Sequence, residues 1–68
     1  MYFQFPEEII HLPSVRNACK EISGGWYCIM IYFKDGGNTS IIFQSKEARD
    51  IMFETFCDVL IKNGEIKI

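Results

Sequence analysis

The stretch from Trp26 to Phe33 is apolar or aromatic at every position. It is followed by a turn sequence over residues 34–38 (KDGGN) and then by a second β-prone run over residues 39–44. Two such runs around a glycine-rich turn predict a β-hairpin. Because the side chains of a strand alternate between its two faces, both faces of the first strand are apolar. Each face therefore has to be covered, either by another part of this chain or by a partner.

The chain is short for the amount of apolar side chain that it carries. Its 68 residues are expected to form one domain at most, and a chain of this size buries only about 60% of its unfolded surface. The composition is 49% hydrophobic and 15% aromatic, which is too apolar for a disordered chain and rich for a small monomer. We therefore expect a homodimer or a higher homo-oligomer, in which a second copy covers surface that one copy leaves exposed.

The three cysteines, Cys19, Cys28 and Cys57, do not form the pattern of a metal centre or of a disulfide framework. They are odd in number and have no CxxC or Cys/His ligand spacing, whereas a structural zinc ion normally takes four ligands. They stand among apolar neighbours, where cysteine acts as a small hydrophobic residue. We expect no metal and no cofactor.

Charge and hydropathy limit the classes of partner and the cellular location that the sequence predicts. The N-terminal residues show neither the basic region nor the cleavage site of a signal peptide, and no apolar run reaches the roughly 18 to 20 residues that span a bilayer. The net charge of −2 argues against nucleic acid as a partner. We expect a cytoplasmic protein that binds itself and another protein, and that does not bind a membrane.

Short strands are expected before the hairpin. Residues 2–5 and 8–12 are β-prone and are separated by Pro6, which cannot donate to a strand ladder. Residues 15–22 fit two structures. A helix is favoured by an N-cap at Ser14 and by apolar residues at i, i+3, i+4 and i+7. A strand is favoured by the short length of the segment and by the Gly24-Gly25 turn that follows it. We favour the strand, which brings Cys19 close to the Cys28 region of the next strand, over residues 26–34.

A helix is predicted over residues 46–62. Ser45 is a suitable N-cap, and Asn63-Gly64 ends the pattern. Apolar side chains cover an arc of about 180° on this helix: Ala48, Met52, Phe53, Phe56, Cys57, Val59 and Leu60. The opposite side is an acidic face formed by Glu47, Asp50, Glu54 and Asp58.

The predicted fold class follows from this order of elements. It is α+β, with an antiparallel β-meander of three to five strands packed against one C-terminal amphipathic helix, in a single domain over residues 1–68. Residues 65–68 alternate between polar and apolar side chains and are compatible with a last short strand.

The aromatic residues of the hairpin are the leading candidates for a partner-binding site. Trp26 and Tyr27 come directly after Gly25 at one end of the strand, and Tyr32 lies near the other end. Aromatic side chains dominate the binding energy of protein interfaces. We therefore predict that Trp26, Tyr27 and Tyr32 contact a partner.

Charged residues provide two alternative sites. Arg16, Lys20 and Lys34 stand near the aromatic residues and are candidates for binding a nucleotide-like ligand at an oligomer interface. The acidic helix face is a candidate for mimicry of the phosphates of DNA. Catalysis has a weaker basis, because the single histidine, His11, has no orienting acid or oxyanion element that spacing would place beside it, and we expect no enzyme.

The order of these motifs resembles a group of small proteins. The run from Ile9 to Leu12, the turn Asp35-Gly36-Gly37 and the helix start Ser45-Lys46-Glu47-Ala48 resemble short uncharacterised bacterial and phage proteins. In these a β-meander precedes one amphipathic helix, similar to part of a pleckstrin-homology-like barrel. Such proteins often act as binding or inhibitory modules, including phage factors that disable host defence. The resemblance implies a non-enzymatic protein-binding or inhibitory module that acts as a homo-oligomer, with the ligand-binding protein and the DNA mimic as alternatives.

Overall fold

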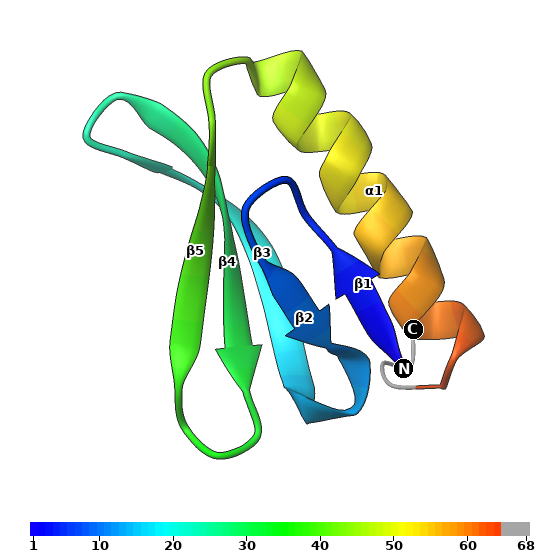
Figure 1. The fold of residues 1–68 in the computed structure, drawn as a ribbon. Coiled ribbons are helices and arrows are strands. Elements are labelled where there is room, and N and C mark those ends of the chain that lie inside the picture. Colours follow the sequence, from blue (N-terminus) through cyan, green and yellow to red (C-terminus); the bar gives the residue numbers. More distant parts are fainter. Residues whose placement is uncertain (65–68) are drawn as a thin grey trace.

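A computed structural model describes residues 1–64 as two antiparallel sheets and one helix (Figure 1). The elements in chain order are β1 (Tyr2–Gln4), β2 (Ile9–His11), a 3-10 turn η1 (Leu12–Ser14), β3 (Val15–Ser23), β4 (Trp26–Phe33), β5 (Asn38–Phe43) and α1 (Lys46–Lys62). The predicted α+β class is confirmed. The strand considered for residues 65–68 lies outside the described residues. No helix among residues 1–64 is long and apolar enough to cross a membrane.

The larger sheet is a three-stranded meander with the order β3-β4-β5. Its first turn, Gly24-Gly25, has φ angles of 59° and 82°, which only glycine adopts without strain and which suit a two-residue hairpin turn. Ser23 consequently pairs with Trp26, and the ladder continues toward the other end of β3. The strand prediction for residues 15–22 is confirmed.

The first two strands form a hairpin of their own. The Phe5 N–H donates to the Glu8 carbonyl at 2.8 Å, which closes a two-residue turn at Pro6-Glu7. Both strands are shorter than predicted. The expected strand over residues 8–12 stops at His11, because Pro13 fixes its own backbone angle and the chain turns through η1 into β3.

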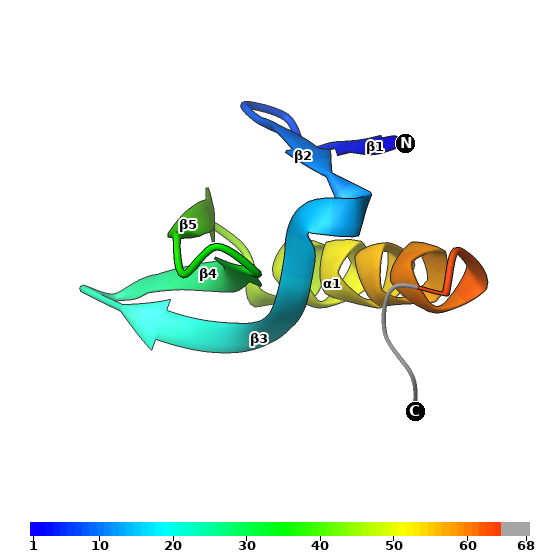
Figure 2. The same cartoon turned by 90° about the horizontal axis from the view of Figure 1, so that it is seen from below.

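The β1-β2 hairpin and α1 cover the same face of the larger sheet, which we call the inner face. In Figure 2 the hairpin forms a separate layer above the sheet. Both elements contribute side chains to one buried cluster with the strands: Phe5, Ile10, Leu12, Val15, Ile29, Ile31, Ile41, Phe56 and Leu60. Phe3, Phe5 and Phe56 join the hairpin to the helix, with ring centroids 4.9 to 5.1 Å apart. Tilted and edge-on contacts at this spacing are favourable for aromatic rings.

Strand β4 therefore has an inner and an outer side that can be told apart. Ile29 and Ile31 are fully buried in the cluster and Phe33 packs against it, so Tyr27 shares this side by alternation. Trp26, Cys28, Met30 and Tyr32 project from the other side, and we call that side of the sheet the outer face. The sequence left open which set would point inward.

The helix begins and ends where the sequence predicts, but its buried side differs by one position. The Ser45 hydroxyl accepts a hydrogen bond from the Ala48 N–H at 3.2 Å, and Asn63 is the C-cap. Ala48, expected within the apolar arc, is exposed, and the neighbouring Arg49 is buried instead. Arg49 stands three, four and seven positions before Met52, Phe53 and Phe56, so it belongs to the same helix face.

Candidate protein-interaction surfaces

The outer face of the larger sheet carries apolar side chains that the rest of residues 1–64 leaves accessible. Trp26 is 46% exposed and Ile42 is 62% exposed, whereas Met30 and Tyr32 are half-buried. Ile42 pairs with Cys28 across the strands and is a diagonal neighbour of Trp26, so these side chains form one continuous patch. Of the three aromatic residues predicted to contact a partner, Trp26 and Tyr32 lie on this patch.

Tyr27 does not lie on the outer face. Its ring faces the helix, and the Arg49 guanidinium carbon stands 5.4 Å from the ring centroid. This contact holds the ring on the inner side, beneath α1. The structure therefore separates Tyr27 from Trp26 and Tyr32, because adjacent residues of a strand point to opposite faces.

Charged residues stand at opposite ends of the outer face. The Arg16 guanidinium lies over the ring of Tyr32, 5.7 Å from its centroid. Glu21 pairs with Cys28 toward the other end, next to the Gly24-Gly25 turn. The outer face thus has one positive and one negative end with an apolar centre.

Cys19 and Cys28 are free thiols on the outer face. Cys19 pairs with Met30, and Cys28 pairs with Glu21, so the two cysteines are diagonal neighbours and do not stand directly opposite each other. Partial burial and the nearby Glu21 carboxylate raise the pKa of the Cys19 thiol. A raised pKa disfavours the thiolate, which is the nucleophilic form of cysteine. Cys28 is buried, and both cysteines act as small apolar side chains of the face.

Arg49 is the buried charge that fastens the helix to the sheet. Its Nε donates to the Asp50 carboxylate at 2.7 Å, and its Nη1 donates to the carbonyls of Glu21 at 2.9 Å and Cys28 at 3.4 Å. Sequence reasoning missed this residue because the predicted buried arc of the helix contained apolar side chains alone. Its place on the same helix face as Met52, Phe53 and Phe56 was the signal that could have identified it.

The acidic helix face is interrupted at Asp50. Its carboxylate lies 3.1 Å from Lys46, 3.8 Å from Lys20 and 2.7 Å from Arg49. Hydrogen bonds from Arg49 and Lys46 lower the pKa of this carboxyl. Glu47, Glu54 and Asp58 stay exposed. The row of four carboxylates considered as a phosphate mimic thus has one member neutralised by cations.

Two of the three cations considered for a nucleotide-like ligand, Arg16 and Lys20, point away from each other. Lys20 points to the helix, where its ammonium lies 5.6 Å from the centre of the Phe53 ring, while Arg16 lies on the outer face. The Lys34 backbone N–H donates to the Ser14 carbonyl at the start of the β4-β5 turn. Arg16 and Lys20 thus lie on opposite faces of β3 and do not share an anion site.

His11 lies on the outward side of the β1-β2 hairpin. Its ring centroid is 5.1 Å from that of Tyr2, and its Nδ1 is within hydrogen-bond distance, 2.7 Å, of the Ser14 hydroxyl. Cys19 and Glu21 belong to the outer face of the other sheet, so the structure does not bring them to His11. Among residues 1–64 no group of three or more His, Cys, Asp or Glu side chains is placed to hold a metal ion.

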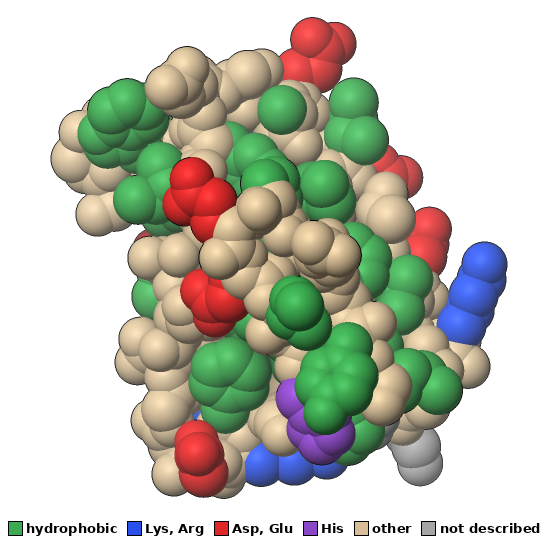
Figure 3. Space-filling view, in the orientation of Figure 1, with side chains coloured by type: hydrophobic (Ala, Val, Ile, Leu, Met, Phe, Trp, Pro, Cys, Tyr) green, Lys and Arg blue, Asp and Glu red, His purple; other side chains and the backbone are tan. Residues whose placement is uncertain are grey.

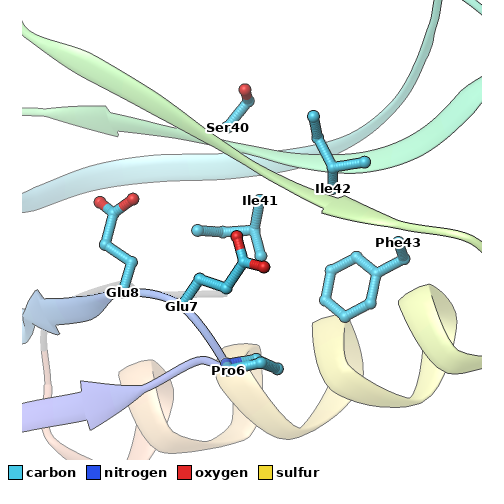
Figure 4. A pocket seen from close by; sticks show the side chains of 7 residues that line it. All are labelled: Pro6, Glu7, Glu8, Ser40, Ile41, Ile42 and Phe43. Atoms are coloured by element: carbon cyan, nitrogen blue, oxygen red, sulfur yellow. The ribbon is translucent and has the colours of Figure 1, made fainter.

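A pocket of about 210 Å³ lies between β5 and the turn of the β1-β2 hairpin, and we call it the edge pocket. Its lining comes from these two segments (Figure 4): Pro6, Glu7, Glu8, Ser40, Ile41, Ile42 and Phe43. The Thr39 hydroxyl donates to the Glu8 carboxylate at 3.1 Å and ties the turn to the strand. No signal in the sequence linked these two segments.

Comparison of the chain with protein-family models, with curated proteins and with solved structures gave no match.

Proposed function

We propose that this chain is a small, non-enzymatic protein-binding module that works as a homodimer joined through its outer face. The observation that carries the proposal is the continuous apolar patch around Trp26, Met30 and Ile42, which neither α1 nor the β1-β2 hairpin covers. Single exposed apolar residues are ordinary, but a contiguous patch with aromatic members is typical of an interface. A module of this kind fits the binding or inhibitory role that the sequence resemblance implies.

The charges at the two ends of the outer face support a symmetric pairing. A two-fold axis between two facing sheets, perpendicular to the strands, stacks each β3 on its counterpart in the opposite direction. The Arg16 end of one copy then meets the Glu21 end of the other. The same operation places Trp26 over the Tyr32 end of the second β4. Opposite charges and aromatic residues thus meet in one arrangement, with the apolar centre between them.

The matched variants Ile42→Ser and Ile51→Ser test the dimer. Ile42 is 62% exposed on the outer face, and Ile51 is 63% exposed on the far side of α1, so the two residues have the same exposure on different surfaces. Burying an isoleucine contributes about 1.5 kcal/mol or more. Since each dimer loses the contact twice, Ile42→Ser should weaken the dimer about 100-fold. Ile51→Ser should leave the dimer unchanged.

Sedimentation equilibrium over a range of concentrations measures both outcomes. The unmodified chain is expected at twice the 7.9 kDa of one copy, and Ile42→Ser at 7.9 kDa. A stable monomer for the unmodified chain would refute the dimer. Equal dimer constants for the two variants would place the interface elsewhere.

A further inference from the structure

Among residues 1–64, no strand pairs with the edge of β5 that faces away from β4. In the β4-β5 hairpin the Phe33 N–H donates to the Gly37 carbonyl at 2.8 Å, and hydrogen-bonded pairs alternate with non-bonded pairs from there along the ladder. The residues whose backbone groups point outward are therefore Asn38, Ser40 and Ile42. None of them makes a backbone hydrogen bond to another segment of residues 1–64.

The two edges of the larger sheet differ in how they are protected. The edge strand β3 carries a bulge between Val15 and Asn17 and the charged residues Arg16, Lys20 and Glu21. Bulges and charges are the usual means by which proteins prevent pairing at an edge. Strand β5 has neither a charged residue nor a proline in Asn38–Phe43. Only the β5 edge thus retains the features of a strand that accepts another strand.

The edge pocket lies beside this unprotected edge and is acidic. In Figure 4 the side chains of Glu7 and Glu8 extend from the hairpin turn toward β5, and the side chain of Ile41 extends from β5 toward the turn. Figure 3 shows acidic side chains among hydrophobic ones on this side of the molecule, with the basic side chains at the lower and right margins of the view. The ion pairs of residues 1–64 all involve Asp50, so neither Glu7 nor Glu8 has a cationic partner there.

We propose that the β5 edge binds an extended, basic segment of another protein, which adds to the sheet as a further strand. The backbone of the segment pairs with Asn38, Ser40 and Ile42. Its alternate side chains point to the inner side, into the edge pocket, where lysine or arginine meets Glu7 and Glu8. The side chains between them point to the outer side, where an apolar residue packs beside Ile42. This inference rests on the proposed function as a protein-binding module and names the partner of a second surface.

Charge excludes a second copy of this chain as the occupant of the same edge. In a symmetric pairing of β5 with β5, the same surface meets itself. Glu7 and Glu8 of both copies would then flank one seam, and β5 offers no cation to either pair. A basic segment at this edge avoids this repulsion and supplies cations that pair with Glu7 and Glu8. The dimer through the outer face leaves the edge open.

The probe is a synthetic capped peptide of alternating lysine and valine, seven residues long, with a glutamate and valine peptide of the same length as the control. Binding is followed by ¹H–¹⁵N NMR and calorimetry on the whole chain. We expect the lysine peptide to shift the amide signals of Asn38, Ser40 and Ile42 and to slow their exchange with solvent. The glutamate peptide should leave these signals unchanged. A peptide N-methylated on the amides that face β5 should lose binding, because it cannot complete the ladder.

Matched protein variants test the charge and the edge separately. The double variant Glu7→Gln, Glu8→Gln should weaken the lysine peptide about fivefold or more, since it removes two charge contacts. Glu54→Gln, which neutralises an exposed carboxylate on α1, should have no effect. Ser40→Pro should abolish binding, because proline removes an outward N–H, and edge positions tolerate proline. If Ser40→Pro does not fold, the N-methylated peptide gives the same information without a change to the protein.

Several results would overturn the site. These are absence of binding at millimolar peptide, equal binding of both peptides, or equal binding after N-methylation. Slow exchange of the Ser40 and Ile42 amides before any peptide is added would mean that this chain itself fills the edge. Failure here is distinguishable from failure of the proposed dimer, because Ile51→Ser, Ile42→Ser and the concentration series report on the outer face without peptide.

Discussion

Replacement of Arg49 tests whether packing or charge holds α1 on the sheet. The side chain is 5% exposed, and its guanidinium lies over the ring of Tyr27. It also donates hydrogen bonds to the carbonyls of Glu21 and Cys28. The variants are Arg49→Ala, which removes both the stem and the charge, and Arg49→Met, which keeps an unbranched stem of similar length without the charge. Their difference isolates the contribution of the stem.

The contacts of Arg49 show which contributions each variant removes. The two methylene groups that alanine lacks contribute about 0.8 kcal/mol each. The contact with Tyr27 adds about 1 kcal/mol, and the short hydrogen bond to Glu21 adds about 1.5 kcal/mol. Relief from burying the guanidinium offsets part of this loss. We expect a cost of about 3 kcal/mol for Arg49→Ala and about 1 kcal/mol for Arg49→Met, because both carbonyls keep their ladder partners and methionine refills the space.

Urea denaturation followed by circular dichroism measures these costs. All variants are made on an Ile42→Ser background, where we expect a monomer, so that the free energy of unfolding does not depend on protein concentration. With a slope of about 1 kcal/mol per molar urea, Arg49→Ala should lower the midpoint by about 3 M and Arg49→Met by about 1 M. Equal midpoints for the two variants would refute the reasoning, because the hydrogen bonds would then outweigh the stem. A midpoint unchanged in Arg49→Ala would show that the helix does not depend on this anchor.

Two further predictions concern the contacts that hold the helix in place. Phe56→Ala should lower the free energy of unfolding by about 3 to 5 kcal/mol. Phe56→Leu should lower it by less than about 1.5 kcal/mol, since leucine refills most of the space beside Phe3 and Phe5. Urea midpoints on the Ile42→Ser background measure both costs. Asp50 contributes stability above about pH 4, where it is ionised in both states, and this stability is lost as the pH falls through its lowered pKa in the folded protein. Asp50→Asn should therefore flatten the acid limb of the stability–pH curve, and an unchanged limb would contradict the role of its three cations.

Much of the fold was predictable because local signals agree with it. The Gly24-Gly25 turn needs positive φ angles, and the Ser45 cap uses a side-chain oxygen, so each is encoded by the residue in place. The strand over residues 15–22 was favoured for a local reason, because Gly24-Gly25 suits a hairpin turn, although the apolar spacing also fitted a helix. These features depend on neighbours in sequence, which is why a single sequence reveals them.

The less predictable features depend on contacts between distant segments. Nothing in residues 1–12 states that the hairpin would leave the meander and cover the inner face, and the aromatic contact between Phe5 and Phe56 spans most of the chain. Arg49 is buried where the Tyr27 ring and two carbonyls of the β3-β4 hairpin lie beneath it. The edge pocket joins the Pro6-Glu7 turn to β5 and has the same origin.

The division of β4 into two sides connects the fold to the proposed function. Its inner residues, such as Ile29 and Ile31, are covered completely by two elements, so the inner face needs no partner chain. The outer residues Trp26 and Met30 contribute little to this core. If these positions served folding alone, polar side chains there would make the chain more soluble. Their apolar character is therefore better explained by an interface than by the stability of one copy. It follows that substitutions on the outer face should change association much more than unfolding, whereas those on the inner face should do the reverse.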